Sequence, residues 1–201
     1  MNISKITPVL IFILLALVSC KRKSSQIGDD YYANQQYEQA IEAYTEYLKL
    51  HPKSVKTLYN RGRAYEELGI RQRALEDYEK VIAIDPENEN AYLSAGMHYY
   101  ELEKYNKASL YFDKAILVNP RCARGFYFKG RVNHQMGLFP DALGEYNKAI
   151  SLDNQLGEAY LYRGAVNIQL KRRTSACQDF NQAKELEVPE ADQAIRKYCR
   201  R

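Results

Sequence analysis

The sequence predicts an all-α protein, a solenoid of five helical hairpins followed by a capping helix. Three columns of residues recur every 34 positions through all five hairpins. The glycine column is Gly28, Gly62, Gly96, Gly130 and Gly164. The alanine column is Ala40, Ala74, Ala108, Ala142 and Ala176, and an aromatic column follows four residues later at Tyr44, Tyr78, Phe112, Tyr146 and Phe180. A fixed period of this length indicates stacked helical repeats, because each hairpin buries its apolar face only against its neighbours.

The columns also predict how the two helices of a hairpin meet. A glycine on the first helix and an alanine on the second let the two backbones approach, and the aromatic side chain one turn later fills the remaining space. Glycine inside a helix costs about 0.5–1 kcal/mol relative to alanine, so close packing is its expected justification. Leu68-Gly69 and Met136-Gly137 mark turns within hairpins, and Pro86 and Pro120 end second helices, because proline cannot continue them.

The first three repeats add two further columns, with tyrosines at Tyr31, Tyr65 and Tyr99 and closing prolines at Pro52, Pro86 and Pro120. The complete pattern resembles the tetratricopeptide repeat over roughly residues 21–190. That resemblance implies a right-handed superhelical solenoid that binds other proteins. The predicted repeats are 21–54, 55–88, 89–122, 123–156 and 157–190, so that the solenoid proper occupies 28–190. Residues 191–201 have helical spacing and are expected to form the capping helix that a solenoid needs.

The pattern changes towards the C-terminal end. Asn133 and Asn167 occupy the tyrosine column, and Asn154 and Val188 occupy the proline column. Repeats four and five are therefore expected to turn or pack differently from the first three.

The first residues predict a signal peptide rather than part of the fold. The apolar run from Val9 to Val18 is too short to span a bilayer but has the size of a signal-peptide core. The four residues from Leu17 to Cys20, Leu-Val-Ser-Cys, resemble the lipobox of bacterial lipoproteins. The resemblance implies removal of residues 1–19, lipidation of Cys20, and a short basic linker within 20–27. With Lys21 after the cysteine, the outer membrane facing the periplasm is favoured for a Gram-negative source. The alternative is an ordinary signal peptide or an uncleaved anchor with a chance cysteine.

Three cysteines remain if Cys20 carries lipid, and they would lie outside the cytosol, where disulfides persist. Cys177 is near the start of the second helix of repeat five. Cys199 is near the end of the capping helix, which should run antiparallel to that helix. We expect these two to form a disulfide, whereas the alternative is two ordinary buried thiols. Cys122 is left as a free thiol.

The candidate binding surface is the concave face that the first helices line in the family this sequence resembles. Its candidate residues are Tyr59, Arg63, Leu93, Met97, Tyr100, Tyr127, Arg131 and His134. Tyr59-Arg63 and Tyr127-Arg131 repeat one pairing of an aromatic ring with a guanidinium. We interpret the face as a groove for an extended or helical peptide, with the two arginines holding acidic or C-terminal carboxylates. The alternative is internal: Arg63 pairs with Glu66 or Glu67, and the tyrosines cover the backbone.

The two-carboxylate clamp of chaperone-binding members is not expected, since its positions carry Ser25, Asp29, Tyr59, Arg63, Leu93 and Met97. Gly125 and Gly130 have the spacing of a phosphate loop, but no Lys-Ser/Thr pair follows and Gly130 belongs to the glycine column. The three histidines fall in different repeats outside any catalytic motif. We therefore expect that the protein is not an enzyme and that it has no cofactor and no metal site.

A net charge of +4 spread along 201 residues argues against nucleic-acid binding. The sequence predicts a membrane-anchored scaffold or adaptor for cell-envelope complexes, with proteins or peptides as partners. The alternative is a self-associating structural protein of the envelope without a peptide groove.

Overall fold

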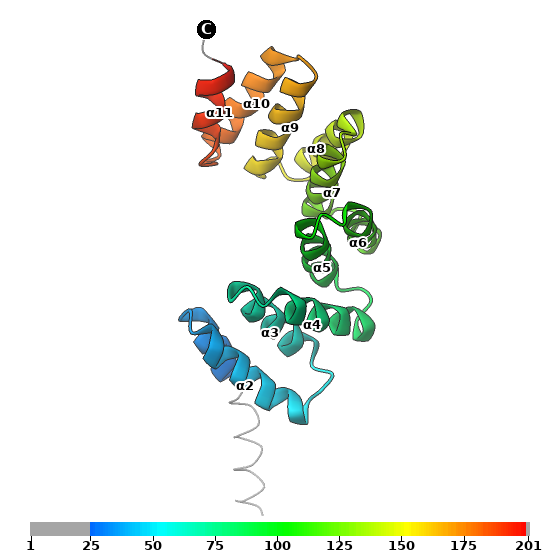
Figure 1. Ribbon diagram of the computed structural model, residues 1–201, viewed down its shortest axis with the longest axis vertical. Coiled ribbons are helices and arrows are strands. Elements are labelled where there is room, and N and C mark those ends of the chain that lie inside the picture. Colours follow the sequence, from blue (N-terminus) through cyan, green and yellow to red (C-terminus); the bar gives the residue numbers. More distant parts are fainter. Residues whose placement is uncertain (1–24, 200–201) are drawn as a thin grey trace, which may run out of the picture. The chain divides into compact units, whose positions relative to one another are not determined.

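The computed structural model describes residues 25–199, and every regular element within that range is a helix (Figure 1). The chain divides into two compact units, one ending at Pro86 and the other beginning at Glu87. Successive helices pack against each other in both units, which confirms the predicted all-α repeat architecture. The predicted signal peptide, the Cys20 lipidation site and the start of the linker lie outside the described residues.

The first unit contains two hairpins. A helix at residues 25–33 is followed by α2 (Tyr37–Leu50), α3 (Val55–Glu67) and α4 (Arg71–Ile84). Ala40, Tyr44 and Ala64 are fully buried where α2 meets α3, and the half-buried Tyr31 and Ile41 pack around them. The alanine and aromatic columns therefore form the core of this unit.

The second unit contains three hairpins and the cap. Its helices are α5 (Glu89–Glu101), α6 (Tyr105–Val118), α7 (Ala123–Gln135), α8 (Phe139–Leu152), α9 (Gly157–Gln169), α10 (Arg173–Glu185) and α11 (Ala191–Tyr198). Each first helix packs mainly on its hairpin partner, and α7 also contacts both α5 and α9. The first helices therefore form a layer of neighbours, which places side chains of three successive repeats within reach of one another.

Each column glycine lies directly against the aromatic ring sixteen residues later. A Cβ added at Gly62 would lie 2.7 Å from Cε1 of Tyr78, and one at Gly130 would lie 2.7 Å from Cε1 of Tyr146. The same contact occurs in all five repeats, at 2.5 to 2.7 Å, and the five aromatic residues are at most 1% exposed. The predicted reason for the glycine column is thus confirmed, and the partner that excludes a Cβ is the ring.

The turns within hairpins use a left-handed residue at the same position of each repeat. Gly69 and Gly137, which the sequence predicts to mark turns, have φ of +70° and +75°. The equivalent residues of the other three repeats are Gln35, Glu103 and Lys171, with φ between +57° and +60°. The turn geometry is therefore set by the hairpin and is adopted even where no glycine reduces its cost.

Repeat four turns like the earlier repeats, contrary to expectation. The Asp153 N–H donates to the Ala149 carbonyl at 2.9 Å, as Asp85 does to Val81 and Asn119 to Ala115 at the ends of α4 and α6. The proline is therefore not needed for this turn. Repeat five does differ: α10 ends one residue early, Glu187 has φ of +59°, and the Val188 N–H donates to the Ala183 carbonyl.

The capping helix α11 packs on α10 and is joined to it by the predicted disulfide between Cys177 and Cys199. Arg173 Nε donates to the Tyr198 carbonyl at 2.7 Å, and the Phe180 and Tyr198 rings stack with centroids 6.1 Å apart. Cys122 is free, as predicted, and it is buried. Its sulfur accepts a hydrogen bond from the Gly125 N–H at the start of α7.

No helix within residues 25–199 combines the length and the apolarity that crossing a bilayer requires.

Replacing Gly130 with alanine should destabilise the second unit by about 1–3 kcal/mol, because the new Cβ forces the buried Tyr146 ring to move. Gly144→Ala is the matched control in the adjoining helix, where nothing lies within 4 Å of the added Cβ. This control should stabilise the helix by about 0.5–1 kcal/mol. Urea denaturation followed by circular dichroism measures both. Equal effects of the two substitutions would contradict the close-packing account.

Reducing the Cys177–Cys199 disulfide should lower the free energy of unfolding of the second unit by about 3 kcal/mol, the loop entropy expected for residues spaced like these. The double variant Cys177→Ser/Cys199→Ser should show the same loss and no further response to dithiothreitol. Cys122→Ser, which keeps an acceptor at the start of α7, is the control and should retain the response. A wild-type denaturation curve unchanged by reductant would contradict the prediction.

Candidate functional site

The candidate residues fall in separate units, with Tyr59 and Arg63 on α3 and the other six on α5 and α7. In the first unit, the ring beneath the exposed Arg63 guanidinium belongs to Tyr32 of the preceding hairpin, with 4.8 Å between Cζ and the ring centroid. The Tyr32 hydroxyl donates to Glu67 at 3.2 Å, while the Tyr59 ring packs 5.4 Å from that of Tyr78. Arg63 and Tyr59 are thus both in aromatic contacts within this unit.

Two carboxylates of the first unit accept hydrogen bonds from the hydroxyls of the aromatic column. Tyr44 donates to Asp29 at 2.8 Å, and Tyr78 donates to Glu66 at 2.6 Å. Asp29 also accepts from Lys56 and Asn60. Burial raises the pKa of Asp29, but these hydrogen bonds outweigh burial and hold its pKa below the usual value. The carboxylate is therefore already occupied by internal donors.

In the second unit, two candidate residues are part of the core. Leu93 is 3% exposed and Tyr127 is 6% exposed, so neither presents much surface to a partner. Met97, Tyr100, Arg131 and His134 are half-buried and remain accessible. The sequence pattern placed all six on the groove-facing sides of their two helices. It could not show how far the neighbouring helices cover those sides.

Arg131 lies among three tyrosine rings from three successive first helices. Its Cζ is 4.6 Å from the ring centroid of Tyr100 on α5, 5.8 Å from that of Tyr127 on α7 and 5.1 Å from that of Tyr162 on α9. We call these four residues the Arg131 cage. Sequence reasoning missed Tyr162, which lies on α9, one first helix beyond the candidate residues. Cation–π contacts of this kind contribute about 0.5–2 kcal/mol each, depending on desolvation.

The guanidinium of the cage has no ion pair with any carboxylate that the structure describes. Its Nε is buried without a hydrogen-bond partner. Burial raises the pKa of Tyr127 and lowers the pKa of His134, so both are neutral at neutral pH. Glu158 is close enough to raise the pKa of Tyr127 further but does not pair with Arg131. The cage therefore holds one uncompensated positive charge.

Three other basic residues of the first helices are paired with carboxylates. Arg61 binds Asp77 through two hydrogen bonds of 2.7 and 2.8 Å, and Arg163 binds Asp179 at 2.6 Å. Lys129 lies 2.8 Å from Asp113 and 3.3 Å from Glu145. These three basic residues occupy one column of the repeat, at spacings that are multiples of 34, and each has an acidic partner sixteen residues later. We call them the charge ladder, and its spacing was a signal that sequence reasoning missed.

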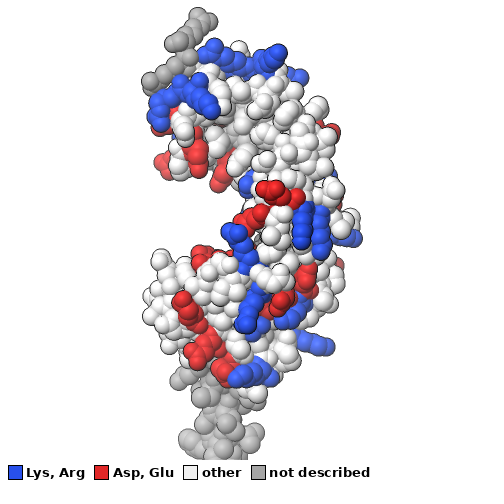
Figure 2. Space-filling model, in the orientation of Figure 1, with Lys and Arg blue, Asp and Glu red and all other residues white. Residues whose placement is uncertain are grey.

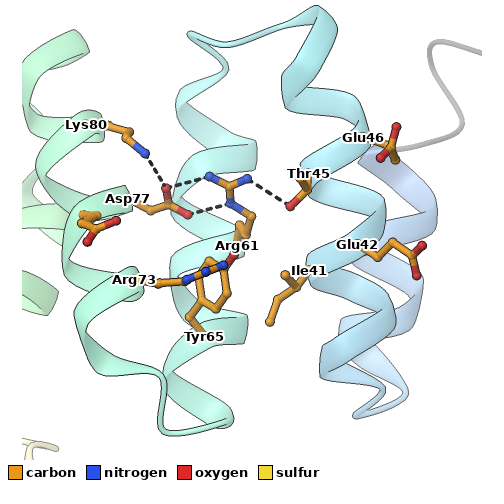
Figure 3. Close-up of a pocket in the computed structure, with 10 residues that line it drawn as sticks. Ile41, Glu42, Thr45, Glu46, Arg61, Tyr65, Arg73, Asp77 and Lys80 are labelled. Atoms are coloured by element: carbon orange, nitrogen blue, oxygen red, sulfur yellow. Dashed lines mark hydrogen bonds and ion pairs between the residues drawn. The ribbon is translucent and has the colours of Figure 1, made fainter.

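The charge ladder joins neighbouring repeats. Arg61 also donates to Thr45 at 3.1 Å, and Arg163 donates to Asn147 at 2.8 Å, in each case on the second helix of the preceding hairpin. Figure 3 shows Arg61 between Thr45 on α2 and Asp77 on α4. These three residues line a hollow of about 560 Å³. Because Arg61 and Asp77 are satisfied by each other, this hollow is a structural junction between repeats.

Basic and acidic side chains are interspersed on the face seen in Figure 2. Among residues 25–199, no three His, Cys, Asp or Glu side chains gather as a metal-binding group.

Comparison with curated protein sequences gave no significant match. Similar solved structures include MamA, at 29% identity and a TM-score of 0.71 over 83% of this chain and 97% of that one. PilW, described as a widely conserved type IV pilus biogenesis factor, is 21% identical with a TM-score of 0.76 over 88% and 85% of the two chains. YrrB, described as having an unusual peptide-binding site, is 18% identical with a TM-score of 0.67 over 87% and 89%.

The model of the tetratricopeptide repeat family matches residues 26–89 and 93–157, which is more than half of the sequence. This agrees with the hairpin packing and with the repeated contact between glycine and aromatic ring. The chain belongs to the tetratricopeptide repeat family.

Proposed function

We propose that this chain is a lipid-anchored interaction scaffold of the bacterial cell envelope, which binds peptide segments of other envelope proteins on the faces of its first helices. Its family supports the role of a protein-interaction scaffold. The observation that carries the peptide-binding part is the Arg131 cage, a half-buried guanidinium among three tyrosines with no acidic partner in the described chain. Tyrosine and arginine are the residue types that most often dominate the binding energy of protein interfaces.

Two structures with the same fold bear on the choice of partner. YrrB is described as having a peptide-binding site, and PilW as a factor in pilus biogenesis. At 18% and 21% identity they share the fold with this chain and do not name its partner. They make peptide segments of envelope assemblies the first class of ligand to test.

The proposed anchor rests on the lipobox that ends at Cys20. Only the seven residues from Lys21 to Ile27 separate that cysteine from the column glycine Gly28. At no more than about 3.5 Å per residue, they hold the first hairpin within roughly 25 Å of the lipid. Lys21, Arg22 and Lys23 can also pair with anionic headgroups, at about 1 kcal/mol each. A scaffold held this way engages partners at the same membrane.

Self-association is the second candidate function, and one surface favours it. Leu110 and Leu117 lie two turns apart on α6 and are 55% and 72% exposed. Such a pair is a possible contact for a second copy of the chain. Light scattering on the full chain in detergent decides this point: an oligomer that Leu117→Lys dissociates supports self-association, and a monomer excludes it.

We expect Arg63→Glu/Arg131→Glu to lose partners in a pull-down of the full tagged chain from detergent-solubilised membranes. The reversed charges repel the acidic groups that the arginines are proposed to hold. Lys53→Glu/Arg121→Glu is the control, because it makes the same charge change at exposed residues outside the candidate surface. Quantitative mass spectrometry compares the recovered proteins. If both variants recover the same partners as the unchanged chain, the first-helix faces are not the binding surface.

Replacing Cys20 with serine should give a protein without acyl chains, because serine cannot receive the lipid. Intact-mass measurement of the unchanged protein should show acyl chains at a mature N-terminus formed by Cys20. Cys122→Ser controls for the loss of a thiol elsewhere. An unchanged protein that carries no acyl chain and keeps its first 19 residues would indicate an uncleaved anchor instead.

A further inference from the structure

The aromatic column carries hydroxyl groups as well as rings, and the first two repeats provide each hydroxyl with a carboxylate. Tyr44 donates to Asp29, fifteen residues earlier, and Tyr78 donates to Glu66, twelve residues earlier. Both acceptors belong to the first helix of the same hairpin. Repeats three and five have phenylalanine in this column and need no acceptor. The hydroxyl group of Tyr146 in repeat four is therefore the remaining member of the series.

Repeat four lacks both carboxylates. The position fifteen residues before Tyr146 is Arg131, and the position twelve residues before it is His134. Tyr146 is 0% exposed, and its hydroxyl has no hydrogen-bond partner. Leaving a buried polar group unsatisfied costs about 1–3 kcal/mol, so native structures contain few of them. The repeat thus keeps a donor whose acceptor is missing from the chain itself.

The Tyr146 side chain adjoins the Arg131 cage, which holds the uncompensated charge. The Tyr146 ring packs against two rings of the Arg131 cage, 6.3 Å from that of Tyr127 and 6.4 Å from that of Tyr162. Burial raises the pKa of Tyr146, so its hydroxyl stays protonated and can donate. Arg131 Nε, also buried, is a second donor without a partner. Two unsatisfied donors and one positive charge are the complement of a single carboxylate.

We propose that a carboxylate group of a bound peptide completes this site, accepting hydrogen bonds from Arg131 and from the Tyr146 hydroxyl. In repeat four the ligand supplies the group that Asp29 and Glu66 supply in repeats one and two. The inference rests on the proposed peptide-binding function and names the chemistry that the peptide must carry. Because the hydroxyl is enclosed, the carboxylate reaches it by displacing a ring of the cage, and Tyr100 and Tyr162 are the half-exposed rings.

A carboxylate can come from an acidic side chain or from a chain terminus, and small probes separate the two sources. Full-length protein labelled with ¹⁵N-arginine in detergent micelles is titrated with N-acetyl-aspartate N-methylamide, which carries a side-chain carboxylate. A second titration uses N-acetylglycine, which carries a terminal carboxylate. N-acetyl-asparagine N-methylamide is the neutral control. We expect a saturable shift of the Arg131 Nε–H signal with one or both acids and none with the amide. The acid that binds more tightly identifies the source of the carboxylate.

Substitutions test the second donor. Tyr146→Phe should weaken binding of the acids about tenfold, the loss expected for one hydrogen bond to a charged group. Tyr78→Phe is the matched control, because its hydroxyl already has Glu66, and it should leave binding unchanged. Without ligand, Tyr146→Phe should leave the melting temperature unchanged or raised, whereas Tyr78→Phe should lower it. A lowered melting temperature for Tyr146→Phe would show that the hydroxyl has an internal acceptor and would overturn the proposal.

Three binding results would also overturn it: no saturable shift at Arg131, an equal response to the neutral amide, or an equal response at the exposed Arg63. The proposed function fails separately, in the pull-down. Partners lost from the charge-reversal variant without any acid binding would leave the scaffold in place and remove this inference. Saturable acid binding with unchanged partner recovery would support the site while contradicting its use by those partners.

Discussion

The close approach of a glycine to an aromatic ring is the contact on which each hairpin depends. At Gly62 and Gly130 there is no room for a Cβ, because the rings of Tyr78 and Tyr146 occupy that space. The contact also sets the chemistry of the surface. A ring that packs on the first helix places its hydroxyl among the side chains of that helix. There, Glu66 accepts a hydrogen bond from the Tyr78 hydroxyl. Core packing and the candidate binding site therefore share the same residues.

Successive hairpins are held in register by charged side chains that are mostly shielded from water. Asp77 is 1% exposed and bonded to Arg61, which also reaches Thr45 of the preceding hairpin. Replacing a buried ion pair with apolar residues is often neutral or stabilising. Such a pair therefore contributes more to specifying which residues pair with each other than to net stability. The charge ladder fits that role, since a hairpin displaced by one helical turn against its predecessor would lose the hydrogen bond from Arg61 to Thr45.

The sequence alone predicted the periodic features, because columns such as the one containing Gly62 depend only on spacing along the chain. It did not predict the left-handed turn at Glu103 or the ordinary turn after α8, since hairpin geometry imposes both without glycine or proline. Within the candidate site, spacing placed Tyr127 on the correct helix face but not in the core, and it missed Tyr162. Burial and cage contacts arise between helices, and no single helix pattern records them.

The buried sulfur at the start of α7 affects how the chain acquires its disulfide. Cys122, Cys177 and Cys199 allow three different pairings, and thiol exchange proceeds through the thiolate. Burial raises the pKa of the Cys122 thiol, and its sulfur is engaged by the Gly125 N–H. Once α7 has formed, this thiol is a poor nucleophile and is shielded from oxidants. If α7 folds early, Cys177 with Cys199 is the one pairing among these three cysteines that stays open.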